Sequence, residues 1–148
     1  MIRVHGSSVT VGDDGILLRG PSGSGKSDLA LRLIDGGAAL VADDQTELTR
    51  VGARLRMTAP AALRGLLEVR GLGIVRVPAA AGAFLALVVD LVDGDAVERL
   101  PEPRTCTLDG VEVPLLELAP FAASAPAKVR LALRTMGQPR AAGALAVP

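Results

Sequence analysis

The sequence predicts a strand-rich α/β domain with few helices. Short apolar runs bounded by glycine and aspartate recur along the 148 residues, which is typical of strands joined by tight turns. Between residues 15 and 34 an apolar run, a glycine-rich loop and a helical pattern follow one another, which is the strand–loop–helix order of α/β proteins. Clear helical patterns are confined to two segments, so regularly alternating strand–helix units are not expected.

The expected elements follow one another within a single domain over residues 1–137. The first helix should end at Gly36 and Gly37, because paired glycines are a helix-stop signal. The strongest apolar run, 84–91, is expected to be the central strand. The other strands are expected at 4–10, 15–19, 38–42, 47–51, 53–58, 111–113 and 115–118, and the helices at 28–34 and 127–136. Residues 138–148, which are poor in large apolar side chains, are expected to form a flexible tail.

The composition argues against several classes of protein. Hydrophobic residues make up 49% of the chain, which favours an ordered globular domain. The formal net charge is zero and Trp and Tyr are absent, so neither a charged nor a stacking surface for nucleic acid is expected. The single cysteine, Cys106, excludes an intrachain disulfide and a cysteine-rich zinc site. Because the sequence shows neither a signal-peptide core nor an apolar run of membrane length, we expect a cytoplasmic protein without a membrane partner.

The glycine-rich loop is the most informative motif. It matches the pattern G-x-x-x-x-G-K-[ST], in which backbone N–H groups surround an anion. Lys26 is one of only two lysines in the chain, and a lysine at this position reaches the β and γ phosphates of a nucleotide. The Ser27 hydroxyl is placed to hold Mg²⁺. A glycine–serine turn that binds nothing is the alternative. The residues of the motif are Gly20, Pro21, Ser22, Gly23, Ser24, Gly25, Lys26 and Ser27.

Two adjacent acids, Asp43 and Asp44, close the apolar run 38–42 about one short helix after the loop. A metal-bound or water-bound acid of the Walker-B type is expected at such a place. Adjacent residues of a strand point to opposite faces, so one acid can face the phosphates while the other faces a neighbouring loop. A solvated acidic turn is the alternative interpretation.

Glu68 lies in an apolar stretch, where a carboxylate costs free energy unless it is paired or binds a metal ion. A structural ion pair with Arg70 is the alternative to metal binding. His5 is the only histidine, and a lone histidine near a chain start is more often without a function.

Taken together, these segments resemble the catalytic domain of bacterial HPr kinase/phosphorylase, in a short form without the N-terminal domain. The resemblance is carried by 4–6 (Val-His-Gly), by the loop 20–27, by 40–44 (Leu-Val-Ala-Asp-Asp) and above all by 66–74 (Leu-Leu-Glu-Val-Arg-Gly-Leu-Gly-Ile). It is good from residue 1 to 91 and poor from 94 to 137.

This resemblance implies an ATP-dependent kinase that phosphorylates a serine of HPr, the small carrier of the phosphotransferase system. Many family members also reverse the reaction by phosphorolysis, which gives pyrophosphate. The family fold is similar to that of phosphoenolpyruvate carboxykinase, which agrees with the strand-rich pattern, and its members assemble as hexamers.

The resemblance also implies a role for each candidate residue. The loop would bind ATP with Lys26 on the phosphates, and Ser27 and Glu68 would hold Mg²⁺. One of Asp43 and Asp44 would deprotonate the substrate serine, and we favour Asp44, with His5 beside it. The residues expected to shape the loop around the reacting centre are Arg70, Gly71 and Gly73.

One departure from the family pattern concerns the segment 119–126. Longer members carry Pro-Gly-Arg-Asn before the last helix, and its arginine is catalytic, whereas this segment has no arginine. Lys128 and Arg130 are candidate substitutes. The departure puts the phosphorolysis activity in question first. It also puts the identity of the substrate protein in question, since a different HPr-like carrier, such as that of the nitrogen-type phosphotransferase system, would also fit. A kinase of the same fold with another protein or small-molecule substrate, and a non-catalytic ATP sensor, are the alternatives.

Overall fold

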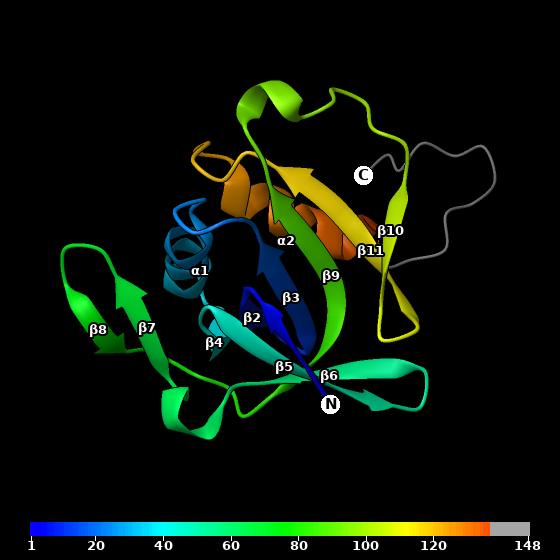
Figure 1. The fold of residues 1–148 in the computed structure, drawn as a ribbon. Helices are drawn as coiled ribbons and strands as arrows, with labels where there is room; N and C mark the ends of the chain where they lie inside the picture. The colour runs from blue at the N-terminus through cyan, green and yellow to red at the C-terminus, as the bar shows by residue number, and fades with distance from the viewer. Residues whose placement is uncertain (137–148) are drawn as a thin grey trace.

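A computed structural model describes residues 1–136 of the chain as a curled, mixed sheet with two helices on one face and a two-stranded arm (Figure 1). The strand order in the large sheet is β1-β5-β6-β9-β3-β2-β4, and β11 joins it by pairing with β9 on one side and β10 on the other. The strands are β1 (Ile2–His5), β2 (Ser7–Val11), β3 (Asp14–Arg19), β4 (Ala39–Ala42), β5 (Gln45–Val51), β6 (Arg54–Thr58), β9 (Ala83–Leu91), β10 (Arg104–Leu108) and β11 (Val111–Leu118).

The strand β9 is central, as predicted from its apolar run. It runs parallel to β3 along most of its length, and its other edge is shared between two partners. β6 pairs antiparallel with its first residues, whereas β11 pairs parallel with its last four. The carboxyl ends of β3, β9 and β11 therefore meet at one edge of the sheet, which is where α/β proteins place their ligands.

Two apolar cores lie on the two faces of this sheet, and the alternation along the strands decides which side chain enters which core. In β3, Ile16 and Leu18 pack with the helices, whereas Leu17 packs on the opposite face. The neighbouring β9 alternates in the same way, with Leu87 and Val89 on the helical face and Val88 on the other. All six side chains are at most 1% exposed, so the pair β3 and β9 is the buried centre of the molecule.

Both helices lie on the same face of the sheet. The helix α1 (Lys26–Asp35) follows β3 directly and ends at Gly36, whose N–H bonds to carbonyl groups of the last turn, as the two glycines predict. The second helix, α2 (Ala125–Met136), packs through Val129 and Ala132 into the same core as α1. Two short 3₁₀ turns, Ala61–Leu63 and Gly94–Ala96, complete the helical structure of the described residues.

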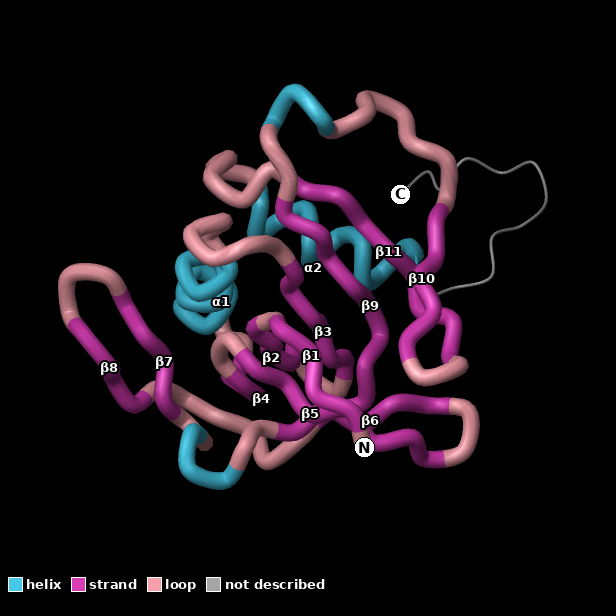
Figure 2. The backbone as a smooth tube through the Cα atoms, in the orientation of Figure 1, coloured by secondary structure: helices cyan, strands magenta, loops and turns pink. Residues whose placement is uncertain are grey.

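The strands β7 (Leu66–Val69) and β8 (Gly73–Arg76) form a hairpin of their own that projects from the sheet beside α1 (Figures 1 and 2). Leu67 is fully buried at its base, whereas Leu72 and Ile74 are more than 70% exposed toward its tip. This hairpin, which we call the arm, contains the segment 66–74 that carries the family resemblance most strongly.

Three expectations about the strands need correction. The run 4–10 is two strands, because the chain turns at Gly6, where a Cβ would lie 2.8 Å from the carbonyl oxygen of Leu18 and 2.9 Å from a methyl group of Leu17. The two runs at 111–113 and 115–118 are one strand: Pro114 lies within β11 and does not interrupt it. The strand β10 had not been predicted, because its sequence carries few apolar residues and it pairs only at the edge of the sheet.

The expected hairpin over 47–58 is confirmed as β5 and β6. The predicted flexible tail, 138–148, lies outside the described residues. Among residues 1–136 no helix has the length and apolar character needed to cross a membrane.

Candidate active site

The glycine-rich loop connects the carboxyl end of β3 to the N-terminus of α1 (Figure 1). Gly23 and Gly25 have φ values of 82° and 100°, in the left-handed region that favours glycine. The helix begins at Lys26, immediately after the loop, so its unpaired N–H groups and the positive end of its dipole face the loop. Both features favour a bound anion such as phosphate, in agreement with the motif.

The Lys26 side chain is almost completely buried against its own loop. Its ammonium group donates to the carbonyl oxygen of Gly20 at 2.8 Å and to that of Pro21 at 3.1 Å. The side chain is therefore fixed across the start of the loop, within the ring of backbone groups that the motif assigns to phosphates.

Asp43 joins three separate segments at the end of the loop. One of its carboxylate oxygens accepts from the Ser27 hydroxyl at 2.8 Å and from the Ser7 hydroxyl at 2.9 Å. The other oxygen accepts from the backbone N–H of Glu68 at 3.0 Å. All three donors are neutral, and no ion pair of Asp43 occurs within residues 1–136. A partly buried negative charge therefore lies directly beside the loop.

Asp44 has a different partner from Asp43, although both acids follow β4 (Ala39–Ala42) and do not lie within the strand, as had been expected. One of its carboxylate oxygens lies 2.8 Å from Nε2 of His5. The backbone of Asp44 has φ 65°, unusual for a residue other than glycine, and it is held on both sides. Its N–H donates to the Ser7 hydroxyl and its carbonyl oxygen accepts from the N–H of Gly6. Strained backbone that is fixed in this way is frequent at functional sites.

The His5–Asp44 pair is open to solvent, because the two side chains are 49% and 64% exposed. A substrate group can therefore reach Asp44, whereas Asp43 is screened by its three donors. The structure thus gives the two acids different surroundings, with Asp43 screened and Asp44 accessible. The sequence alone did not distinguish them.

The arm reaches the site through the backbone of Glu68. Within the described chain Glu68 and Arg70 form no ion pair, so the alternative of a structural Glu68–Arg70 pair is wrong. The carboxylate of Glu68 is exposed, and no bond joins Arg70 to the loop or to the acids in the part of the chain that the structure describes. Gly71 lies in the turn of the arm and Gly73 begins β8, with φ values of 93° and 94°.

The oxygen donors at the end of the loop fit Mg²⁺, which prefers hydroxyl, carboxylate and phosphate oxygen atoms. Ser27 and Asp43 supply two of these donors 2.8 Å apart, and the backbone N–H of Glu68 bonds to the other oxygen of Asp43. No group of three or more His, Cys, Asp or Glu side chains arranged for a metal ion occurs in residues 1–136. This fits an ion that nucleotide phosphates help to hold, since Mg²⁺ commonly takes only one or two carboxylates from the protein.

Sequence reasoning missed an ion pair at the other end of the loop. Arg19, which precedes Gly20, donates twice to Asp90 at the end of β9, at 2.7 and 3.0 Å. These bonds raise the pKa of the Arg19 guanidinium, and burial raises that of the neighbouring Cys106 thiol. No local pattern could have shown this pair, because its members lie on two strands 71 residues apart.

A second missed contact ties the segment 119–126 to α1. Arg32 donates to the carbonyl oxygens of Pro120 and Ala122, and the Phe121 ring lies against Gly25 of the loop. Arg130 does not replace the missing arginine, because it donates to the carbonyl oxygen of Leu33 at the far end of α1.

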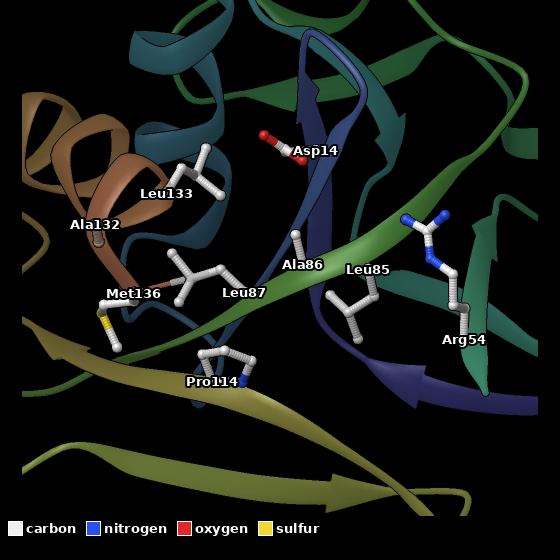
Figure 3. Close-up of a pocket in the computed structure, with 9 residues that line it drawn as sticks. All are labelled: Asp14, Arg54, Leu85, Ala86, Leu87, Pro114, Ala132, Leu133 and Met136. Atoms are coloured by element: carbon white, nitrogen blue, oxygen red, sulfur yellow. The ribbon is translucent and has the colours of Figure 1, made fainter. Parts of the chain in front are cut away.

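One hollow at the opposite end of β9 is distinct from this site. It has a volume of about 380 Å³ and opens between β9, β11 and the end of α2 (Figure 3). None of the candidate residues lines it. Its lining residues are Asp14, Arg54, Leu85, Ala86, Leu87, Pro114, Ala132, Leu133 and Met136.

Known proteins share both the sequence and the fold. HPr kinase/phosphorylase of an Exiguobacterium species is 38% identical over 130 residues, which is 80% of this chain and 42% of that protein. The Chlorobium phaeobacteroides protein of the same name is 39% identical over 132 residues, 80% of this chain and 41% of that one. The chain thus spans about two fifths of the length of these relatives.

A solved structure, the HPr(Ser) kinase/phosphatase from Coxiella burnetii, has the same fold. Its TM-score is 0.81 at 25% identity, and the match covers 92% of this chain and 96% of that one. This confirms the predicted strand-rich α/β kinase fold. The family model described as the HPr serine kinase C-terminal domain matches residues 1–118, from β1 to the end of β11. The chain therefore belongs to the HPr serine kinase C-terminal domain family.

Proposed function

We propose that this chain is a Mg-ATP-dependent protein serine kinase that phosphorylates HPr or an HPr-like carrier of the phosphotransferase system. One observation carries the proposal: Asp43 links Ser27 of the phosphate loop to Glu68 of the arm, with the solvent-accessible His5–Asp44 pair directly beside it. A phosphate clamp, a metal-binding oxygen pair and an accessible base are the three parts that phosphoryl transfer requires.

In this proposal the loop N–H groups and Lys26 bind the phosphates of ATP. Ser27, Asp43 and Glu68 would hold Mg²⁺, which neutralises charge on the transferred phosphoryl group when it is bound. Lys26 would leave its backbone acceptors for phosphate oxygens, which are stronger partners for an ammonium group because they are charged.

The acceptor serine would donate its hydroxyl proton to Asp44. His5 contacts only one oxygen of that carboxylate, so the other oxygen remains available to the incoming hydroxyl. The backbone bonds of Asp44 to Gly6 and Ser7 fix its position, which a general base requires. Asp43 is less suited to this role because three donors already use its two oxygens.

The reverse reaction needs inorganic phosphate to be bound and activated beside a phosphoserine. The segment 119–126 contributes no arginine to that step, and Arg130 is engaged at the other end of α1. We therefore expect phosphorolysis to be weak compared with the forward transfer. A hexameric assembly and a cytoplasmic location remain predictions from the resemblance and the sequence.

Mass spectrometry tests this function. Purified HPr-like carrier from the same organism, incubated with the protein, Mg²⁺ and ATP, should gain one phosphoryl group on a serine. The Lys26→Ala variant should transfer none. A carrier that stays unmodified while ATP binds would contradict the carrier as substrate.

The segment 119–126 favours one alternative, a kinase of the same fold with another acceptor, because it is the part of the site that departs from the family. Small-molecule acceptors and other proteins, compared with the carrier in the same assay, distinguish this case. A non-catalytic ATP sensor would bind ATP and transfer nothing to any acceptor.

A further inference from the structure

The segment between β11 and α2 places an exposed aromatic ring on the phosphate loop. A Cβ built on Gly25 would lie 3.0 Å from two ring atoms of Phe121 and 3.2 Å from Cβ of Pro120. The ring edge is therefore in direct contact with the backbone of the loop. The rest of the Phe121 side chain is open, since the residue is 69% exposed.

The backbone that carries this ring is held by hydrogen bonds on both sides of Phe121. The Arg32 guanidinium donates to the carbonyl oxygen of Pro120, the residue before Phe121, and to that of Ala122, the residue after it. Arg32 is itself fixed on α1 by an ion pair with Asp28, one helical turn earlier. Most of the ring surface is therefore open to a ligand that binds at the loop.

Phe121 is the only phenylalanine, tyrosine or tryptophan at this end of the sheet. The chain contains two phenylalanines and neither Trp nor Tyr. The other ring, Phe84, lies under the guanidinium of Arg54 at the opposite end of β9. The ring on the loop is therefore the one flat apolar surface near the phosphates.

We infer that Phe121 is the base-contacting residue of the nucleotide site, with its ring packed against the purine of ATP. Phosphates bound by the loop leave the nucleoside outside it, and the exposed ring lies against Gly25 of the loop. Aromatic rings bind bases through their π faces without hydrogen-bond readout, so this contact adds affinity rather than selectivity for one base.

This inference rests on the proposed function, because it takes ATP as the ligand. It also gives the segment 119–126 a role that differs from that of the family's arginine. The arginine acts in catalysis, whereas this segment would contribute to nucleotide binding.

The test compares two probes that share the phosphates and differ in the base. Affinities of the full chain for Mg-ATP and for inorganic pyrophosphate are measured by titration calorimetry, in the wild type and in Phe121→Leu, which removes the ring and keeps an apolar side chain. Phe121→Leu should weaken ATP binding about tenfold. The pyrophosphate affinity of Phe121→Leu should stay within about twofold of that of the wild type. Phe121→Trp, which keeps an aromatic ring at this position, should bind ATP about as tightly as the wild type.

Phe84→Leu is the matched control, since it makes the same change at the other end of β9. It should leave both affinities unchanged, and thermal melting verifies that each variant is folded. Equal losses for ATP and pyrophosphate in Phe121→Leu would overturn the inference, because the ring would then shape the loop.

Two further outcomes can be distinguished from these by the same measurements. Unchanged ATP affinity in Phe121→Leu, with a raised KM for the carrier, would overturn base contact and assign the ring to the acceptor. A wild-type protein that binds neither probe would overturn the proposed function together with the inference.

Discussion

Two carboxylates lie at the two ends of the phosphate loop, and their surroundings differ. Asp90, at the end of β9, forms two charged hydrogen bonds with Arg19 just before the loop. Asp43, after β4, accepts only from neutral groups, one of which is Ser27 at the other end of the loop. The first acid is neutralised by its partner, whereas the second keeps its negative charge next to a phosphate site.

Under the proposed function, this difference separates a structural acid from a chemical one. A bidentate pair with arginine satisfies both oxygen atoms of Asp90 and fixes the ends of the parallel strands β3 and β9. A carboxylate held by hydroxyl and amide groups is oriented but not compensated, so it can still attract a cation. By its position in the sheet alone, Asp90 would have been the better candidate for the metal-binding acid. It lies near the end of β9, the strand that runs parallel to β3, which leads into the loop.

The largest effect should come from Asp43→Asn. The substitution keeps the size of the side chain and removes the charge, so we expect transfer to fall by roughly 10²–10³. The amide would turn one donor toward Ser27 or Glu68, which should lower the melting temperature by a few degrees. Steady-state transfer to the carrier and thermal melting measure the two effects. Near-normal transfer would show that Asp43 is not the acid that serves the metal.

The next largest effect should come from His5→Ala, which extends the comparison to Asp44. Loss of the bond to Nε2 frees Asp44 to rotate, and we expect transfer to fall about tenfold while ATP affinity is unchanged. His5→Gln offers a donor at a similar place and should recover part of the rate. If ATP affinity falls along with the rate, His5 contacts the nucleotide and does not act by positioning Asp44.

A smaller effect on transfer should come from Asp90→Asn. It leaves the Arg19 guanidinium without a charged partner, so we expect a loss of about 1 kcal/mol in stability, since the pair is partly exposed. Transfer should remain within about threefold of the wild type, because the acid does not touch the reacting groups. Thermal melting and the transfer assay measure the two quantities. A loss of transfer as large as that of Asp43→Asn would break the distinction between the two acids.

The smallest effect concerns Cys106, which lies beside the Arg19–Asp90 pair. Burial raises the pKa of its thiol, so a smaller fraction is thiolate at any given pH than for a free cysteine. Alkylation by iodoacetamide at pH 8 should therefore be several-fold slower than for a cysteine peptide. Asp90→Asn should move the rate back toward the peptide value or above it, because it removes a nearby negative charge and leaves Arg19. An alkylation rate equal to that of the peptide would contradict the burial of this thiol.

Much of the site was readable from the sequence because its parts are local. A strand, a glycine-rich loop and a helix follow one another without a break, so Lys26 and Ser27 are placed by their neighbours. The same holds for α1, which ends at Gly36, and for β9, whose uninterrupted apolar run identifies a strand buried on both faces. The place of Asp43 and Asp44 directly after a buried strand was also predicted. Strand alternation is not the reason that they reach different partners, because both follow β4 and Asp44 has left-handed backbone.

Tertiary structure alone decided the partners of these groups. Ser7 meets Asp43, Arg19 meets Asp90, and Phe121 meets Gly25 because the sheet order brings together segments that are 36, 71 and about 96 residues apart. Such contacts leave no periodic trace in the chain, and the same serine, arginine or phenylalanine elsewhere would be an ordinary surface residue. The sequence by itself therefore determined the glycine-rich loop and the kinds of group near it, whereas strand pairing decided which acid carries a free charge and which ring lies against the loop.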